Sequence, residues 1–165
     1  MLQYKQTHKK YIMKVVRLNW NVKIKFIDDG DVMGVISVVD PTSSIDIYLG
    51  TGGGPEGVLA AAALHCLGGQ MQTRLVLKDK DQIKRAEALS ISDLRKKYSI
   101  VDMVKGDVIF CATGITDGAM LKGIINKGAY FEANSFVLHK SQNISKKVKN
   151  IIKKWKQVLF QEKIG

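Results

Sequence analysis

The residues most able to do chemistry gather in a glycine-rich segment, Gly50–Gly57. Its five glycines let the backbone approach a ligand closely, and Pro55 presets the first turn of a following helix. The free N–H groups at the start of such a helix attract anions. Glu56 puts a carboxylate at the same place, so a divalent cation between Glu56 and a substrate phosphate would reconcile the two charges. The alternative is an acid that only interacts with the helix dipole.

Nucleotide-binding patterns explain this segment less well. A literal G-x-G-x-x-G run ends at Gly57, but a dinucleotide pyrophosphate would lie against Glu56, and Pro55 lacks an N–H donor. The lysine and the serine or threonine of a Walker sequence are absent. A dinucleotide-binding module is therefore the weaker alternative.

Two more polar turns and three histidines are candidates. Asp28–Asp31 is either a simple turn or a site for sugar hydroxyls or metal. Thr113–Gly118 is predicted to be a capped helix start. His8, His65 and His139 have no partner at ligand spacing, and we assign His65 to the core.

The elements that position these turns alternate between strands and helices. Strands are predicted at Val22–Ile27, Ile45–Leu49 and Asp107–Ala112, each followed by one of the turns. Strands rich in Val, Ile and Phe that alternate with helices indicate an α/β architecture with a largely parallel sheet flanked by helices. Ligands of such sheets bind beyond the carboxyl ends of the strands, where all three turns lie.

Five helices are expected. Lys9–Leu18 is amphipathic, Asp81–Leu89 is polar, and a short helix starts at Ser92. Val58–Leu67 is apolar on every side, which predicts burial on more than one face. Ser145–Gln161 has apolar residues at helical spacing and lysines elsewhere, so it should dock by one stripe. Binding of that basic helix to a membrane surface is the alternative.

Composition and charge narrow the class of protein. The 165 residues are 45% hydrophobic and 25% charged, as in globular domains. There is no apolar run of about 18 residues, no signal peptide and no metal spacing at Cys66 and Cys111, so we expect a cytoplasmic protein in a reducing compartment. The net charge of +11 suggests nucleic acid, but only four of the 26 basic residues are arginines. A solvated lysine-rich surface follows, with no nucleic-acid and no membrane partner.

Three motifs resemble a known family. Gly52–Ala62 resembles the G-G-[AG]-P-E-G-V-x-A-A-A signature of class II fructose-1,6-bisphosphatases, and Phe26–Val32 resembles the family's D-G-D-V turn. Ile109–Gly118 with Leu121–Gly123 resembles its A-T-G-[IV]-T-D-G block. The similarity runs from about Lys5 to Val148 and covers the second half of the family's usual length.

The resemblance implies a fold and an activity. The fold would be layered and inositol-phosphatase-like, with residues 1–140 as its C-terminal α/β portion and 141–165 as a lysine-rich C-terminal helix. The activity would be Mn²⁺- or Mg²⁺-dependent hydrolysis of fructose 1,6-bisphosphate to fructose 6-phosphate and phosphate, a step of gluconeogenesis. We expect a truncated or split member that is inactive alone.

The resemblance also assigns roles to residues. Glu56 matches a metal ligand, and Gly53 matches a position that contacts the sugar bisphosphate. No catalytic residue falls in this half, and Thr7 stands where the family has an arginine, whose bidentate grip on phosphate a hydroxyl cannot replace. The other substrate-binding positions are Lys5, Asp29, Gly30 and Asp31.

The expected partners follow from the missing half of the family's length. They are a sugar bisphosphate, a separately encoded N-terminal half and further copies of the chain, because half of a fold exposes apolar surface. The alternative function is a non-catalytic remnant or partner subunit that binds a sugar phosphate.

Overall fold

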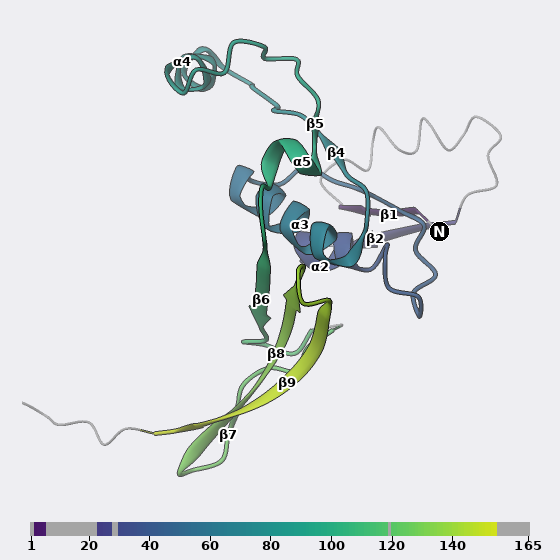
Figure 1. The fold of residues 1–165 in the computed structure, drawn as a ribbon, viewed down its shortest axis with the longest axis vertical. Coiled ribbons are helices and arrows are strands. Elements are labelled where there is room, and N and C mark those ends of the chain that lie inside the picture. Colours follow the sequence, from purple (N-terminus) through teal and green to yellow (C-terminus); the bar gives the residue numbers. More distant parts are fainter. Residues whose placement is uncertain (1, 6–22, 28–29, 119, 155–165) are drawn as a thin grey trace, which may run out of the picture. The chain divides into compact units, whose positions relative to one another are not determined.

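The computed structural model describes residues 2–5, 23–27, 30–118 and 120–154 (Figure 1). The chain divides into two compact units. One comprises Met1–Phe110 with Leu138–Ser145, and the other comprises Cys111–Val137 with Lys146–Gly165. The helix predicted at Lys9–Leu18 lies outside the described residues.

The first unit contains a small parallel sheet. Its strands are β1 (Leu2–Lys5), β2 (Ile24–Ile27) and β3 (Ile47–Leu49), in the order β2-β1-β3. Both neighbouring pairs run parallel. The helix α2 (Asp31–Ile36) follows β2, and α3 (Gly54–Leu67) follows β3. The strands predicted at Val22–Ile27 and Ile45–Leu49 are thereby confirmed, and so is the helix predicted after the glycine-rich segment.

The core of this unit forms around α3. Ala60, Ala61 and Leu64 are buried against Val35 of α2 and Ile100, the first residue of α5 (Ile100–Met103). Alanines on this face let the neighbouring helix approach closely, because they leave little side chain between the two backbones. The bulkier apolar residues at the start of α3 face away from this core and are about half exposed.

A short ribbon carries a polar helix. The strands β4 (Gln72–Thr73) and β5 (Tyr98–Ser99) pair antiparallel, and α4 (Lys80–Ala88) lies between them in the chain. The Asp79 carboxylate caps α4 by accepting a hydrogen bond from the Gln82 N–H at 2.8 Å. The polar helix predicted at Asp81–Leu89 is thereby confirmed. The short helix predicted at Ser92 is wrong, because a turn forms there instead.

The remaining strands form an antiparallel sheet. They are β6 (Ile109–Thr113), β7 (Ile125–Asn126), β8 (Tyr130–His139) and β9 (Ile144–Lys153). The long strand β8 pairs with each of the other three. The Gly114 N–H bonds to the Asn134 carbonyl and the Lys140 N–H to the Val108 carbonyl, which sets β6 antiparallel to β8.

The prediction of a layered, inositol-phosphatase-like fold around a largely parallel sheet is wrong for the described residues. Three small sheets are present in place of one, and the two beyond β1–β3 are antiparallel. The physical reason is local connection: β8 follows β7, and β9 follows β8, through turns too short for the crossover that a parallel pair needs.

The predicted C-terminal helix is also wrong over its described part, because residues 144–153 form β9. Val148, Ile151 and Ile152 satisfy helical spacing, but β-branched side chains also favour a strand, and the neighbouring β8 offers a hydrogen-bonding partner. The alternative of membrane binding depended on an amphipathic helix, which this strand replaces. The strand carries four lysines, Lys146, Lys147, Lys149 and Lys153. Within the described ranges, no helix combines the length and the apolar character needed to cross a membrane.

Candidate functional site

The parallel sheet brings two of the predicted turns to one edge. Register pairs Lys5 with Ile27, and Tyr4 with Leu49, so β1, β2 and β3 all end at the same edge. The chain leaves β2 into the Asp28–Asp31 turn and leaves β3 into the glycine-rich segment. This is the edge at which α/β sheets bind ligands.

The structure describes the predicted site residues to different extents. Thr7 and Asp29 lie outside the described residues, and only the backbone is described for Lys5 and Asp31. Gly30 caps α2 in the left-handed conformation, with φ 86°, and its carbonyl accepts the Gly34 N–H at 2.8 Å. A residue with a Cβ would be strained at Gly30, so the turn into α2 depends on glycine there.

Glu56 and Gly53 form the central feature of the candidate site. Gly53 is the extended N-cap of α3, and Glu56 lies in the first turn. The Glu56 carboxylate folds back over Gly53, and a Cβ added to Gly53 would collide with its Oε2 atom. The carboxylate of this exposed residue therefore lies at the glycine turn, at the edge where a ligand is expected.

The donor set fits part of a cation site. Among the described residues there is no group of three or more His, Cys, Asp or Glu side chains placed to hold a metal ion. A magnesium site uses one or two carboxylates together with water and substrate phosphate oxygens. Glu56 fits one such ligand, and the described residues do not complete a site.

The third turn has a structural role and belongs to the second unit. No helix starts at Thr113–Gly118, so that prediction is wrong. The Asp117 Oδ1 atom accepts the Gly123 N–H at 2.9 Å and closes a loop. The Thr113 hydroxyl lies 2.8 Å from the hydroxyl of buried Ser135, to which the Asn150 amide also donates at 2.9 Å. These side chains tie β6, β8 and β9 together.

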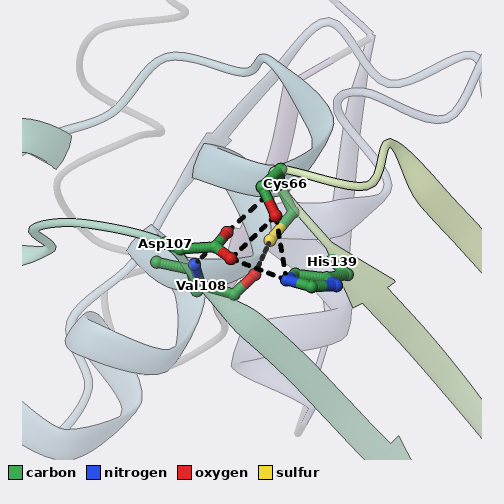
Figure 2. A network of polar contacts seen from close by, with 5 residues as sticks. Cys66, Asp107, Val108 and His139 are labelled. Atoms are coloured by element: carbon green, nitrogen blue, oxygen red, sulfur yellow. Dashed lines mark hydrogen bonds and ion pairs between the residues drawn. The ribbon is translucent and has the colours of Figure 1, made fainter.

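A polar network that the sequence analysis missed joins the start of β6 to the end of β8 (Figure 2). The Asp107 Oδ2 atom lies 2.8 Å from His139 Nε2 and accepts the Ser141 hydroxyl at 2.7 Å. Its Oδ1 atom accepts the N–H groups of Val108 and Ser141. The partners lie 32 and 34 residues apart in sequence, so strand pairing, and no motif spacing, brings them together.

This network does not have the geometry of a nucleophilic triad. Such a triad needs the serine on one imidazole nitrogen and the aspartate on the other. Here both Ser141 and Asp107 contact the same atom, His139 Nε2. The pKa of Asp107 is lowered to about 2, mainly by the hydrogen bond from the Ser141 hydroxyl and next by the one to His139. The arrangement stabilises an ionised carboxylate that fastens two strands.

Cys66 lies beside this network, and its thiol has low reactivity. Its Sγ donates to the Val108 carbonyl at 3.5 Å. Burial raises the pKa of the Cys66 thiol, which disfavours the reactive thiolate. Both Cys66 and Cys111 are free thiols.

Comparison with known proteins decides the family. A family profile described as bacterial fructose-1,6-bisphosphatase, glpX-encoded, matches residues 1–152. The chain belongs to this family. As a member of the glpX-type fructose-1,6-bisphosphatases, it carries the glycine turn, Glu56 and the loop at Thr113–Gly118 inside the matched range.

Curated relatives within the family span more polypeptide than this chain. The fructose-1,6-bisphosphatase class 2 of Haemophilus influenzae is 34% identical over an alignment of 147 residues, and the match covers 81% of this chain and 44% of the relative. The fructose-1,6-bisphosphatase 1 class 2 of Escherichia coli K12 is 32% identical over an alignment of 144 residues, and the match covers 79% of this chain and 43% of that protein. The chain thus spans less than half the length of these glpX-type relatives.

Proposed function

We propose that this chain provides the substrate-facing part of a fructose-1,6-bisphosphatase. The reaction would release the 1-phosphate of fructose 1,6-bisphosphate and leave fructose 6-phosphate, a cytoplasmic step of gluconeogenesis. The observation that carries the proposal is the Glu56 carboxylate at the glycine turn, on the strand-end edge of a chain that matches the family over residues 1–152.

Glu56 and the turn around it have the first role. The Glu56 carboxylate would give one oxygen to a divalent cation, and Gly53 leaves the space that this carboxylate occupies. The N–H groups that open α3 would bind phosphate oxygens, because they lack partners within the helix. Mn²⁺ or Mg²⁺, when bound, supplies charge that polarises the phosphate and lowers the pKa of a bound water.

The neighbouring strand ends would hold the sugar. Gly30 sets the turn from which Asp31 starts α2, and Lys5 ends β1 at the same edge. A lysine there offers a point charge to the second phosphate, and the aspartates of the Asp28–Asp31 turn would accept hydrogen bonds from sugar hydroxyls. Thr7 would add a hydroxyl in place of a guanidinium, so the grip on phosphate at that position is weak.

A non-catalytic subunit that binds sugar phosphate is the second candidate. It is favoured by the donor set, because Glu56 is a single carboxylate and the described residues hold no group of metal ligands. On either reading the 165-residue chain alone should release almost no phosphate, since one carboxylate cannot assemble a site with several ligands.

A chimera separates the two candidates. In it, the matched stretch of the Haemophilus influenzae relative is replaced by this chain, and phosphate release from fructose 1,6-bisphosphate is measured with Mn²⁺. We expect turnover that falls by at least about 100-fold in Glu56→Gln, because the loss of a metal ligand should cost no less than the roughly 10–100-fold that follows the loss of a group supporting a ligand. Glu87→Gln, an exposed acid in α4, is the control and should leave turnover unchanged. A folded chimera that binds the sugar bisphosphate without turnover would favour the non-catalytic subunit.

A further inference from the structure

Tyr48 lies between α2 and the start of the glycine-rich segment. It belongs to β3 and packs against the core of the first unit. A Cβ added to Gly34, in α2, would lie 2.8 Å from Cε2 and 3.1 Å from Cδ2 of Tyr48. A Cβ added to Gly50 would lie 2.9 Å from Cζ and 3.0 Å from Cε1 of the same side chain. The two glycines therefore meet opposite edges of one aromatic ring.

Close approach to this ring is the physical reason for both glycines. Neither Gly34 nor Gly50 is among the described glycines with a positive φ, so the backbone conformation would allow other residues. Gly34 also lies inside a helix, where glycine is less favourable than alanine. The ring is rigid, and a shift away from one glycine brings it onto the other. Tyr48 is thus confined between α2 and the residue that opens the glycine-rich segment.

The helix α2 rests on both strands that lead into the site. A Cβ at Gly34 would also lie 2.9 Å from Cδ1 of Ile27, the last residue of β2. Lys25 and Tyr48 both pair with Gln3 of β1, so they share one face of the sheet. Ile27 follows Lys25 by two residues and lies on that face as well. The position of α2 is therefore set by the end of β2 and by the Tyr48 ring.

The contacts of Tyr48 extend to both turns of the candidate site. Gly34 lies one helical turn from Gly30, whose carbonyl accepts the Gly34 N–H at 2.8 Å. Gly50 begins the segment that leads to Glu56 in the first turn of α3. The width of the Tyr48 ring thus separates the helix that follows one turn from the first residue of the other.

We propose that Tyr48 is a positioning residue that sets the spacing between the Asp28–Asp31 turn and the glycine-rich segment. A ligand that reaches both turns, such as a sugar with two phosphates, gains from simultaneous contact only if their spacing matches its length. Inorganic phosphate reaches one turn and does not depend on the spacing. The inference rests on the proposed function, because it takes these turns as the two ends of one sugar-phosphate site.

The test compares two ligands of the 165-residue chain by isothermal titration calorimetry with Mg²⁺ present. The ligands are fructose 1,6-bisphosphate and inorganic phosphate. In Tyr48→Leu, which removes the ring, we expect the affinity for the bisphosphate to fall at least about tenfold and that for phosphate to change by less than about twofold. Tyr48→Phe keeps the ring and should bind the bisphosphate within about twofold of the unsubstituted chain.

A second variant and a matched control complete the design, and circular dichroism checks that each variant is folded. Gly50→Ala keeps the Tyr48 ring and forces the exposed start of the segment away from it. It should show the same selective loss, even if Tyr48→Leu does not fold. Tyr98→Leu removes another half-buried strand tyrosine of the first unit, one whose ring centroid lies 5.0 Å from Lys96 Nζ. It should leave both affinities unchanged.

Three results would overturn the inference. Equal losses of affinity for the bisphosphate and for phosphate in Tyr48→Leu would indicate a general role in the fold. A loss in Tyr48→Phe as large as in Tyr48→Leu would assign the effect to the hydroxyl in place of the ring. An unchanged affinity for the bisphosphate in folded Tyr48→Leu or folded Gly50→Ala would show that the spacing does not matter.

Binding and turnover separate this inference from the proposed function. Selective loss of bisphosphate affinity together with an inactive chimera would keep the role of Tyr48 and reject the phosphatase activity. An active chimera together with unchanged affinities in the Tyr48 variants would reject only the role of Tyr48. An unsubstituted chain that does not bind the bisphosphate would reject the sugar-phosphate site and this inference with it.

Discussion

Gly53 has no side chain, and the Glu56 carboxylate lies where a Cβ of residue 53 would be. The space of a Cβ is filled by Oε2 of Glu56, so the glycine determines where the acid can lie. Backbone freedom is not the reason for this glycine, because its φ of −70° suits any residue. The Glu56 carboxylate is the end of a flexible, exposed side chain, so a Cβ at Gly53 would displace it from this place, and that displacement couples the two residues.

Gly53→Ala and Gly57→Ala form a matched pair for this link. A Cβ at Gly57, inside α3, meets no atom within 4 Å, whereas one at Gly53 meets Glu56. We expect Gly53→Ala to lower the free energy of unfolding by about 1 kcal/mol, since it also replaces a favourable N-cap. Gly57→Ala should be neutral or stabilising by about 0.5 kcal/mol.

A double-mutant cycle with Glu56→Ala measures the coupling by urea unfolding. The cost of Gly53→Ala should shrink when the carboxylate is absent. An unchanged cost would mean that the two side chains do not compete for this space.

Asp107 gives a prediction for acid pH. Its pKa falls from 3.8 to about 2 on folding, so the folded state favours the ionised form. The stability from this group is fully present above about pH 4 and is lost as the pH falls toward 2. In Asp107→Asn, the melting temperature should vary less between pH 4 and pH 2 than in the unsubstituted chain. Glu87→Gln serves as the control, and an equal loss of pH dependence there would contradict the assignment.

The cluster at Glu56 could be predicted from the sequence, whereas the cluster at Asp107 could not, for a physical reason. The glycine turn and Glu56 are neighbours in the chain, so their types and spacing predicted an anion or cation site. Asp107, His139 and Ser141 meet only because β6 pairs with β8. No local pattern encodes such a meeting, since it depends on strand register.

At the scale of elements, short-range pattern predicted the strands β2, β3 and β6 and the helices α3 and α4. It did not predict β9, because Val148, Ile151 and Ile152 satisfy helical spacing and strand preference at once. Tertiary pairing with β8 decides between the two. The loop at Thr113–Gly118 was mistaken for a helix start because threonine and aspartate both cap helices and close loops.

Ser135 is expected to hold three strands of this sheet together. It is 5% exposed and bonds to Thr113 and to Asn150. Ser135→Ala leaves both partners without their hydrogen bond and should cost about 1–3 kcal/mol of unfolding free energy in urea titration. Ser145→Ala, at an exposed position of β9, should change it by less than about 0.5 kcal/mol. Equal effects would deny Ser135 this role.

At the scale of the whole molecule, composition predicted a globular protein, and the three motifs predicted the family. The fold class was wrong because alternation of strands and helices says nothing about how later strands pair. The chain spans 44% of the Haemophilus influenzae relative, and the apolar residues Ile47 and Leu49 of β3 and Val58 and Leu59 of α3 are about half exposed.

The isolated chain should associate weakly with itself. In sedimentation velocity, its weight-average mass should rise with concentration from the monomer value, because apolar surface is exposed. The double substitution Leu49→Asp and Val58→Asp should suppress the rise, and Leu89→Asp should suppress it less. A mass that is constant across a hundredfold range of concentration would contradict this prediction.

The lysines of β9 affect whether the β8–β9 hairpin aggregates in concentrated solution. Within the described part of the chain β9 pairs only with β8, which leaves its other edge as a template for cross-β fibres. Four lysines lie in this strand, so a second copy added in register would stack ammonium on ammonium. Acetylation of these lysines, or high salt, would therefore turn a protected margin into a seed for fibrils.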